Sequence, residues 1–308
     1  MIEITSVLCP VDFSDFSRHA LAHAVVIARW YDASLTVFHA YSAGLPPMLF
    51  SGYSGVVPVE PIPVPPLLHA TREATLSELR RFANFVNTTD VQMRFEARPG
   101  ATVQAILDEA KSLPADLIVL GTHGRGGLDR MVLGSVAEKV LRKATAPVLT
   151  VPPPVSAPAA DALVIFKRIL CPIDFSESSM KALSYGVSLA QEADAQLLVM
   201  HAIEGFSDLA HWKHPNPLVL EYLRISEKEA LAQLRSAIPK EASTWCQPEE
   251  VLATGKAYRE ILRVARERDV HLIVMGVHGR NPLDLLFLGS TTNQVVRAAT
   301  CPVLTLRS

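Results

Sequence analysis

The residues of this chain best suited to binding a ligand lie in two loops with the same glycine spacing. The segment GTHGRGGLDRMVLGS begins at Gly121, and GVHGRNPLDLLFLGS begins 155 positions later at Gly276. A glycine directly after a strand lets the backbone turn sharply and approach a ligand without a side chain in the way. Where Gly-Ser opens a helix, the free N–H groups and the positive dipole end suit a phosphate. The spacing therefore predicts a phosphate-holding loop in each half.

The two loops differ in charge and stiffness. Arg125 and Arg130 add positive charge to the first loop, whereas the second has Asn281-Pro282 in place of two glycines and Leu285 in place of Arg130. Neither loop has the GxxxxGK pattern of a P-loop or the GxGxxG dinucleotide fingerprint. We therefore expect the second site to hold an anion less strongly than the first.

Turn and cap chemistry alone also accounts for such glycines. Ser135 with Glu138 three residues later forms a possible capping box that needs no ligand. The second copy has Asn293 in place of the acid, which leaves the hydroxyls of Ser290 and Thr291 more available to a phosphate. Both interpretations stay open for the first loop.

An aspartate follows the first predicted strand of each half. Asp12 and Asp174 stand in the repeated motif Cys-Pro-Val/Ile-Asp-Phe-Ser, one residue past the expected strand end. Such a carboxylate can accept hydrogen bonds from ribose or an adenine amino group, or help to hold Mg²⁺ beside phosphates. The alternative is an Asx-turn or helix cap leading into Ser14 or Ser176.

Histidines give three further candidates. His123 and His278 lie inside the glycine loops, where they either contact phosphate or pack on the turn. Two other pairs have zinc-like spacing, but no third ligand is evident near either, so a surface position is favoured and no metal site is predicted. These pairs are His19 with His23, and His211 with His214.

The strands and helices that position these residues are predicted from two alternating patterns of apolar residues. Apolar runs rich in β-branched residues alternate with segments whose apolar residues recur every three or four positions, which indicates βαβ units around a parallel sheet. The predicted strands of the first half are 5–9, 34–40, 91–97, 116–121 and 147–151, and its helices are 14–31, 66–86, 101–111 and 135–144. The predicted strands of the second half are 168–171, 196–202, 250–253, 272–276 and 302–306.

In an open parallel sheet, ligands bind outside the carboxyl ends of the strands, at the point where the strand order reverses. The loops after the first and fourth strands meet there. These are the loops with the strongest identities between the two halves, so we expect them to form one site in each half.

The repeat also defines the domain organisation. The glycine loops are 155 positions apart, but the CPVDFS and CPIDFS motifs are 162 apart, so the first copy carries seven more residues between Ala40 and Gly100. The extra length falls in a proline-rich segment, 45–66, which we interpret as a lid, a partner-binding surface or a plain connection. We predict one domain at 1–152, a stiff Pro/Ala-rich linker at 153–165 and a second domain at 166–308.

Bulk composition narrows the class of protein. The chain has 308 residues, 49% of them hydrophobic and 19% charged, with a net charge of -2. This composition indicates a globular protein with no basic excess for nucleic acid, no membrane span and no leader, so we expect a cytoplasmic location. The four cysteines lack CxxC spacing, and we interpret them as reduced core residues.

At this point the residues carry a family resemblance. The spacing G-x2-G-x9-G-S/T, met in both loops, resembles the ATP-binding signature of universal stress proteins, as do the Val-Asp-Phe-Ser opening and the Ala-Pro-Val-Leu-Thr-Val strand. The resemblance covers nearly the whole chain. It implies two tandem, doubly wound, Rossmann-like α/β domains, each with a five-stranded parallel sheet of order 3-2-1-4-5, that pair through their last strands as a pseudo-dimer.

The resemblance further implies ATP or a related adenine nucleotide, with Mg²⁺, across the ends of the first and fourth strands. The residues implied in the first half are Pro10, Val11, Asp12 and Ala40 around base and ribose, and Gly121, His123, Gly124, Arg125, Gly134, Ser135 and Val136 around the phosphates. Their counterparts are Pro172, Ile173, Asp174, Ala202, Gly276, His278, Gly279, Arg280, Gly289, Ser290 and Thr291.

The function implied is a nucleotide-dependent regulator or switch in the stress response. No residue stands out as a nucleophile or general base, so the sequence favours a binding protein with at most slow hydrolysis. The alternatives are a Mg²⁺-dependent ATPase or phosphoryl or nucleotidyl transferase, and a dimerisation scaffold that binds no nucleotide. A homodimer and an unidentified protein partner are also expected.

Overall fold

The computed structural model describes residues 2–42, 64–86, 88–124, 133–153, 166–204, 217–246, 248–277 and 288–307. Strands and helices alternate in both halves, as the hydrophobic periods predict. The first half contains β1 (Ser6–Pro10), α1 (Asp15–Trp30), β2 (Ser34–Tyr41), α2 (Val64–Ala83), β3 (Met93–Pro99), α3 (Thr102–Ser112), β4 (Leu117–Gly121), α4 (Ser135–Lys143) and β5 (Val148–Val151). The second contains β6 (Arg168–Pro172), α5 (Glu177–Glu192), β7 (Gln196–Ile203), α6 (Pro217–Ala237), a short 3-10 helix (Lys240–Thr244), β8 (Glu249–Thr254), α7 (Ala257–Glu267), β9 (Leu272–Gly276), α8 (Ser290–Ala298) and β10 (Val303–Leu306).

All ten described strands form one sheet, in the order β3-β2-β1-β4-β5-β10-β9-β6-β7-β8. Each half therefore has the predicted order 3-2-1-4-5, with parallel pairing between its neighbouring strands. The halves join where β5 and β10 pair antiparallel, with Leu304 opposite Leu149. The predicted pairing of the two halves through their last strands is confirmed.

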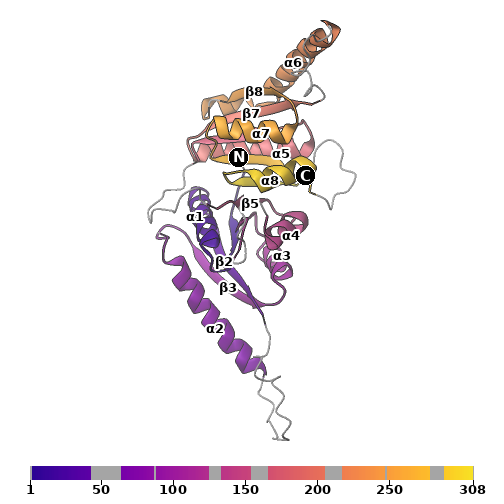
Figure 1. The fold of residues 1–308 in the computed structure, drawn as a ribbon. Coiled ribbons are helices and arrows are strands. Elements are labelled where there is room, and N and C mark those ends of the chain that lie inside the picture. Colours follow the sequence, from indigo (N-terminus) through magenta and orange to yellow (C-terminus); the bar gives the residue numbers. More distant parts are fainter. Residues whose placement is uncertain are drawn as a thin grey trace, which may run out of the picture.

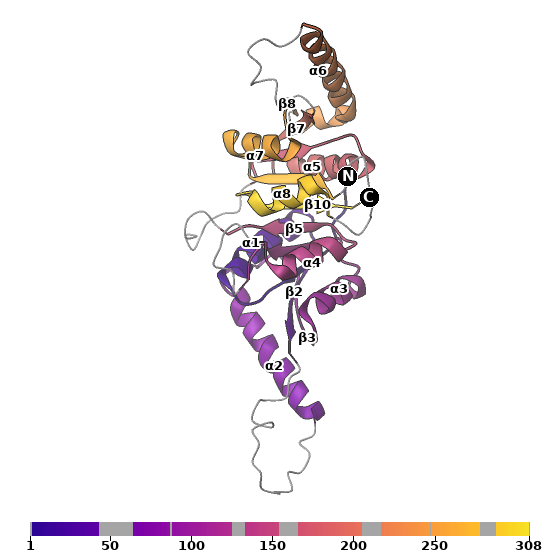
Figure 2. The ribbon, with the colours of Figure 1, turned by 45° about the vertical axis from the view of Figure 1, so that its right-hand side comes forward.

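Two layers of helices cover the sheet. One core cluster packs α1, α2, α5 and α6 against one face, and the other packs α3, α4, α7 and α8 against the opposite face. The central strands are buried on both faces, which explains their continuous apolar sequences. In the two ribbon views, α2 and α6 extend beyond opposite ends of the sheet (Figures 1 and 2).

The first helix of each half begins with a serine cap. The Ser14 side chain accepts a hydrogen bond from the Ser17 N–H, and Ser176 does the same with Ser179 in the second half. This cap satisfies an N–H group that has no partner inside the helix. It also fixes the chain direction just after β1 and β6, where the two aspartates stand.

The histidine pair on α1 contradicts its predicted surface position. His23 is buried, with its ring 5.6 Å from that of Phe166, and its Nδ1 donates to the backbone oxygen of His19 at 2.8 Å. His19 in turn donates from Nδ1 to Pro152 O at 3.1 Å. The two histidines thus contact Pro152 and Phe166, the residues on either side of the predicted linker. A four-residue spacing does not show which helix face is covered by a distant segment.

The cysteines are free and buried at all four positions, as the sequence predicts. Cys9 and Cys171 occupy equivalent places in β1 and β6, and burial raises the pKa of both thiols. The predicted segment 45–66 and the pair at 211 and 214 lie outside the described residues, except that α2 begins at Val64.

Candidate functional site

A cavity of about 810 Å³ lies at the carboxyl ends of β1 and β4, where the strand order reverses. Its walls come from the loop after β1, the end of β2, the start of α3, the loop after β4 and the first turn of α4. The structure brings together ten of the predicted first-half residues in this wall. These are Pro10, Val11, Asp12, Ala40, Gly121, His123, Gly124, Gly134, Ser135 and Val136. Arg125 lies outside the described residues.

Glycines are required where the two loops approach each other. A Cβ atom at Gly124 would stand 2.7 Å from Asp12 Oδ2, and one at Gly134 would stand 2.9 Å from the backbone oxygen of Thr122. The Gly134 N–H donates to that same oxygen at 2.7 Å. These glycines hold the backbone against the cavity wall, where any larger residue would displace it.

The N-terminus of α4 faces the cavity without a side-chain cap. Gly134 is the N-cap residue and has no side chain that could cap the helix, so Ser135 does not hold the cap position that the possible capping box requires. Ser135 is instead the first residue of the helix, and Glu138 pairs with Arg142 at 3.1 Å. The first N–H groups of α4 and its positive dipole end are therefore available to an anion in the cavity.

Asp12 has both of the arrangements that the sequence left open. Its Oδ1 accepts from Ser14 N at 3.1 Å, and from Ser14 Oγ and Ser17 Oγ at 2.5 Å each, which is the predicted turn and cap. The same carboxylate also lines the cavity. The next residue, Phe13, has a φ of 65°, a conformation that costs free energy for a side chain of this size. The turn thus orients the carboxylate towards Gly124.

His123 packs on the turn and also lines the cavity. It is buried, its ring lies 5.6 Å from that of Phe16, and its Nδ1 lies 2.9 Å from Thr122 Oγ1. The packing interpretation is therefore confirmed for this residue. Its position in the wall leaves it within the candidate site.

His39 is a cavity residue that the sequence reasoning missed. Its Nδ1 donates to Val11 O at 2.7 Å, and its ring lies 4.6 Å from that of Phe13. Because a carbonyl oxygen only accepts, Nδ1 carries a hydrogen and is the donor. The signal was present in the repeat, where His39-Ala40 returns as His201-Ala202.

The apolar part of the wall was also missed, because core and pocket residues have the same sequence signature. Phe38, Ile106, Leu120 and Leu133 line the cavity beside the predicted residues. They give it the mixture of apolar wall and few polar groups that is typical of small-molecule sites, whose volumes run from roughly 300 to 1,000 Å³.

The second half repeats this geometry at the end of β6. Asp174 Oδ1 accepts from Ser176 N at 3.1 Å, Phe175 has a φ of 65°, and His201 Nδ1 donates to Ile173 O at 2.8 Å. Pro172 ends β6 and Ala202 lies in β7, as their first-half counterparts lie in β1 and β2. The two halves therefore build the same turn from the same residues.

The N-terminus of α8 also matches that of α4. Gly289 is its N-cap without a side-chain hydrogen bond, and Ser290 and Thr291 form its first turn. At the end of β9, a Cβ atom on Gly276 would stand 2.6 Å from Ser178 Oγ. The predicted residues His278, Gly279 and Arg280 lie outside the described residues.

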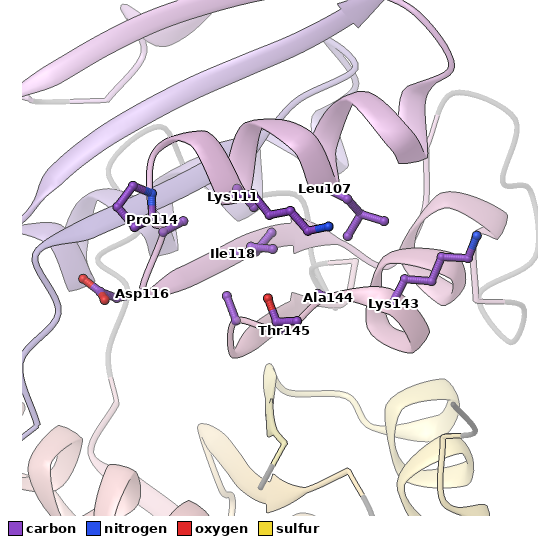
Figure 3. Close-up of a pocket in the computed structure, with 11 residues that line it drawn as sticks. Leu107, Lys111, Pro114, Asp116, Ile118, Lys143, Ala144 and Thr145 are labelled. Carbon is purple, nitrogen blue, oxygen red and sulfur yellow. The ribbon is translucent and has the colours of Figure 1, made fainter. Parts of the chain in front are cut away.

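A second cavity of about 360 Å³ lies at the amino end of β4, at the opposite end of the strands from the first cavity. Figure 3 shows Lys111, in the last turn of α3, and Lys143, the last residue of α4, among its lining residues, with Leu107 between them. Helix C-termini meet here, and they carry the negative dipole end. This cavity is separate from the candidate site, which lies at the N-terminus of α4.

Among the described residues, no group of three or more His, Cys, Asp or Glu side chains is placed to hold a metal ion. No helix in the described ranges has the length and apolarity needed to span a bilayer.

The fold and the cavity together define a tandem α/β protein with a cavity at the switch point of a doubly wound sheet. Comparison with known proteins gives the family. The profile of the Universal stress protein family matches residues 3–152 and again 165–307. The chain belongs to the universal stress protein family, with two copies of its domain in tandem.

Relatives match both one half and the whole chain. Universal stress protein YxiE of Bacillus subtilis is 36% identical over 148 residues, which are 46% of this chain and 100% of the relative. A universal stress protein of Mycolicibacterium smegmatis is 25% identical over 98% of this chain and 96% of its own length. A crystal structure of a universal stress protein from Archaeoglobus fulgidus shares the fold, with a TM-score of 0.63, 19% identity and 99% of each chain covered.

Proposed function

We propose that the cavity of the first half binds ATP or a related adenine nucleotide. The observation that carries this proposal is the N-terminus of α4, which has no side-chain cap and opens onto a cavity with an apolar wall. A helix N-terminus attracts phosphate, and an apolar wall suits a purine ring. A ligand with both groups uses both parts of the cavity.

Each part of the wall has a role in this proposal. The base would lie against Val11, Phe38 and Ala40, and the ribose hydroxyls would donate to Asp12. The phosphates would lie on the backbone of Gly121, Gly124 and Gly134 and on the hydroxyl of Ser135. Mg²⁺ bound with the phosphates would offset their negative charge.

The same proposal extends to the second half, with Asp174, Gly276, Gly289, Ser290 and Thr291 in the equivalent roles. We propose that the units 1–152 and 166–308 act as a pair of sites joined by β5 and β10. The protein would act mainly by binding nucleotide, and a partner would recognise the nucleotide-bound form. Slow hydrolysis would limit how long that form lasts.

The test is direct. The purified protein is denatured, and released nucleotide is identified by mass spectrometry, while ATP with Mg²⁺ is titrated calorimetrically into wild type and Gly134→Glu. The new carboxylate would clash with Thr122 and repel phosphate, so we expect binding at the first site to be lost. Thr145→Glu is the matched control, because it adds the same charge beside the second cavity, at the amino end of β4. An absence of nucleotide and of binding heat in wild type would refute the proposal.

A further inference from the structure

A carboxylate in the wall of the first cavity is held by an arginine of the other half. Glu138 lines the cavity from the first turn of α4. Its Oε1 lies 3.1 Å from the Arg142 guanidinium on the same helix, and its Oε2 lies 3.5 Å from the guanidinium of Arg297 on α8. Both helices pack on the same face of the continuous sheet (Figures 1 and 2). The first candidate site is therefore in contact with the second half.

The repeat shows that this contact is one-sided. Arg142 and Arg297 are equivalent residues, 155 positions apart, and each lies in the last turn of its helix. Glu138, however, is matched by Asn293, whose buried Oδ1 has no hydrogen-bond partner. Two arginines thus converge on one carboxylate, whereas the first turn of α8 has no acidic residue.

That charge works against the ligand proposed for the site. A carboxylate near the start of a helix is favourable for the dipole, but it repels a phosphate bound at the same helix end. The side chain of Glu138 is 27% exposed, so an unpaired carboxylate would be free to turn towards the cavity. Pairing with two guanidinium groups offsets its charge and fixes its direction.

We propose that Arg297 is a positioning residue for the first-half site, through which the second half sets the affinity of the first for anionic ligands. It holds the Glu138 carboxylate towards α8 and offsets its charge. The inference rests on the proposed nucleotide site. It makes the pairing of the two halves a condition for tight binding in the first.

A second contact between the halves keeps α4 in place when Arg297 is replaced. Arg307, which follows β10, donates to the backbone oxygens of Leu141 and Arg142 in the last turn of α4. These oxygens are among those that an α-helix leaves without an internal partner. A change at Arg297 therefore tests the charge on Glu138 without releasing the helix.

The experiment is a double-mutant cycle of Arg297→Gln and Glu138→Gln. All proteins carry Gly289→Glu, which places a carboxylate at the start of α8 and prevents phosphate binding at the second site. Calorimetric affinities are measured for ATP, AMP and adenosine at low and high salt. For ATP, we expect Arg297→Gln to weaken binding about five-fold and Glu138→Gln to tighten it by a similar factor, as for a partly exposed charge pair.

The electrostatic role has a signature that a structural defect lacks. The loss with Arg297→Gln should be largest for ATP, smaller for AMP and absent for adenosine, and it should shrink at high salt. In the Glu138→Gln background, Arg297→Gln should change ATP affinity less than about two-fold, because the charge that it offsets is gone. Arg297→Lys should restore part of the affinity.

Lys143→Gln is the matched control, since it also removes one positive charge, but from the end of α4 that lines the second cavity (Figure 3). Equal losses for ATP and adenosine, additive effects in the cycle, or an equal loss in the control would each overturn this inference while leaving the nucleotide site intact. An absence of adenine nucleotide binding in the parent protein would instead refute the proposed function, and this inference with it.

Discussion

A methyl group on Gly124 would stand 2.7 Å from Asp12 Oδ2, so the loop after β4 and the loop after β1 meet at these two residues. Real Cβ contacts are longer than this, so one of the loops would have to move. Asp12 is not free to yield, because Ser14 and Ser17 hold its other oxygen. The contact couples the two loops that form the candidate site.

Gly124→Ala should therefore impair the site more than the fold. We expect the affinity for adenine nucleotide to fall at least about ten-fold, since a displacement of about an ångström in a binding wall carries a cost of this order. The change lies in a loop, so the melting temperature should fall by only about 2–4 °C. Calorimetric titration and thermal unfolding of the same sample check the two effects. Unchanged affinity would show that the loops do not meet around the ligand.

The second prediction concerns the close packing of α5 against β6 at a glycine of the second half. A Cβ atom on Gly186, in α5, would overlap Cys171 Sγ, in β6. We expect Gly186→Ala to lower the free energy of unfolding by about 1–3 kcal/mol through overpacking. Cys171→Ala should relieve much of that loss in the double variant, which chemical denaturation of all four proteins would reveal.

The first half is the natural control for this change, because Ala24 and Cys9 stand at the equivalent positions and are both fully buried. Ala24→Gly should not stabilise the protein, since it opens space and favours the unfolded chain. If Gly186→Ala has no effect on unfolding, the close approach of α5 to β6 is wrong.

The strands and their order could be predicted because the same pattern of apolar runs and motifs occurs in both halves of the sequence. The five apolar runs of each half, with helix-period segments between them, leave few alternatives to a parallel sheet, and two copies of the motif point to the same strand ends. The two loops of the first site followed from that topology, whereas its individual residues came from the repeated motifs and the resemblance to universal stress proteins. Loops after the first and fourth strands of such a sheet must meet, and Asp12 and Gly124 do so.

What the sequence did not predict depends on contacts between the halves and on the exact start of a helix. The capping box at Ser135 fits the pattern, but Gly134 already occupies the cap position, a shift of one residue that propensity does not resolve. His23 looked like a surface residue because Phe166, which covers it, lies far along the chain. Glu138 was considered only as part of a cap, and its partner Arg297 belongs to the other half.

The buried His23 makes stability depend on pH. Burial, together with the nearby His19, lowers its pKa from 6.5 to about 3, although the hydrogen bond to the His19 backbone works in the opposite direction. A lowered pKa means that the folded protein favours the neutral ring. Its contribution is therefore fully present above pH 6.5, and it is lost as the pH falls from 6.5 towards 3.

We expect His23 to account for a decrease in the free energy of unfolding on the order of 4 kcal/mol across that range. In His23→Gln, which cannot titrate, the slope between pH 6.5 and 4 should become shallower, although the variant is less stable at pH 7. Urea unfolding at several pH values measures both slopes. Identical slopes in wild type and variant would show that His23 is not buried in the folded protein.

A hydrogen bond between helices of different halves gives the last prediction. Tyr31, at the end of α1, lies with its hydroxyl 2.9 Å from Ser188 Oγ on α5, and Ser188 is buried. Burial is the main cause that raises the pKa of Tyr31 to about 12, with Glu192 and Tyr185 adding to the shift and Ser188 opposing it. Tyr31→Phe and Ser188→Ala remove the two partners of this bond.

Each single variant should lower the free energy of unfolding by about 1 kcal/mol, and the double variant should lose less than the sum, because one bond accounts for both losses. The raised pKa adds a second readout. The folded protein keeps the phenol protonated, so this part of the stability is present below pH 10 and is lost as the pH rises towards 12. Tyr31→Phe should remove that loss, whereas Ser188→Ala should leave it. Additive losses in denaturant unfolding would mean that Tyr31 and Ser188 do not bond across the two halves.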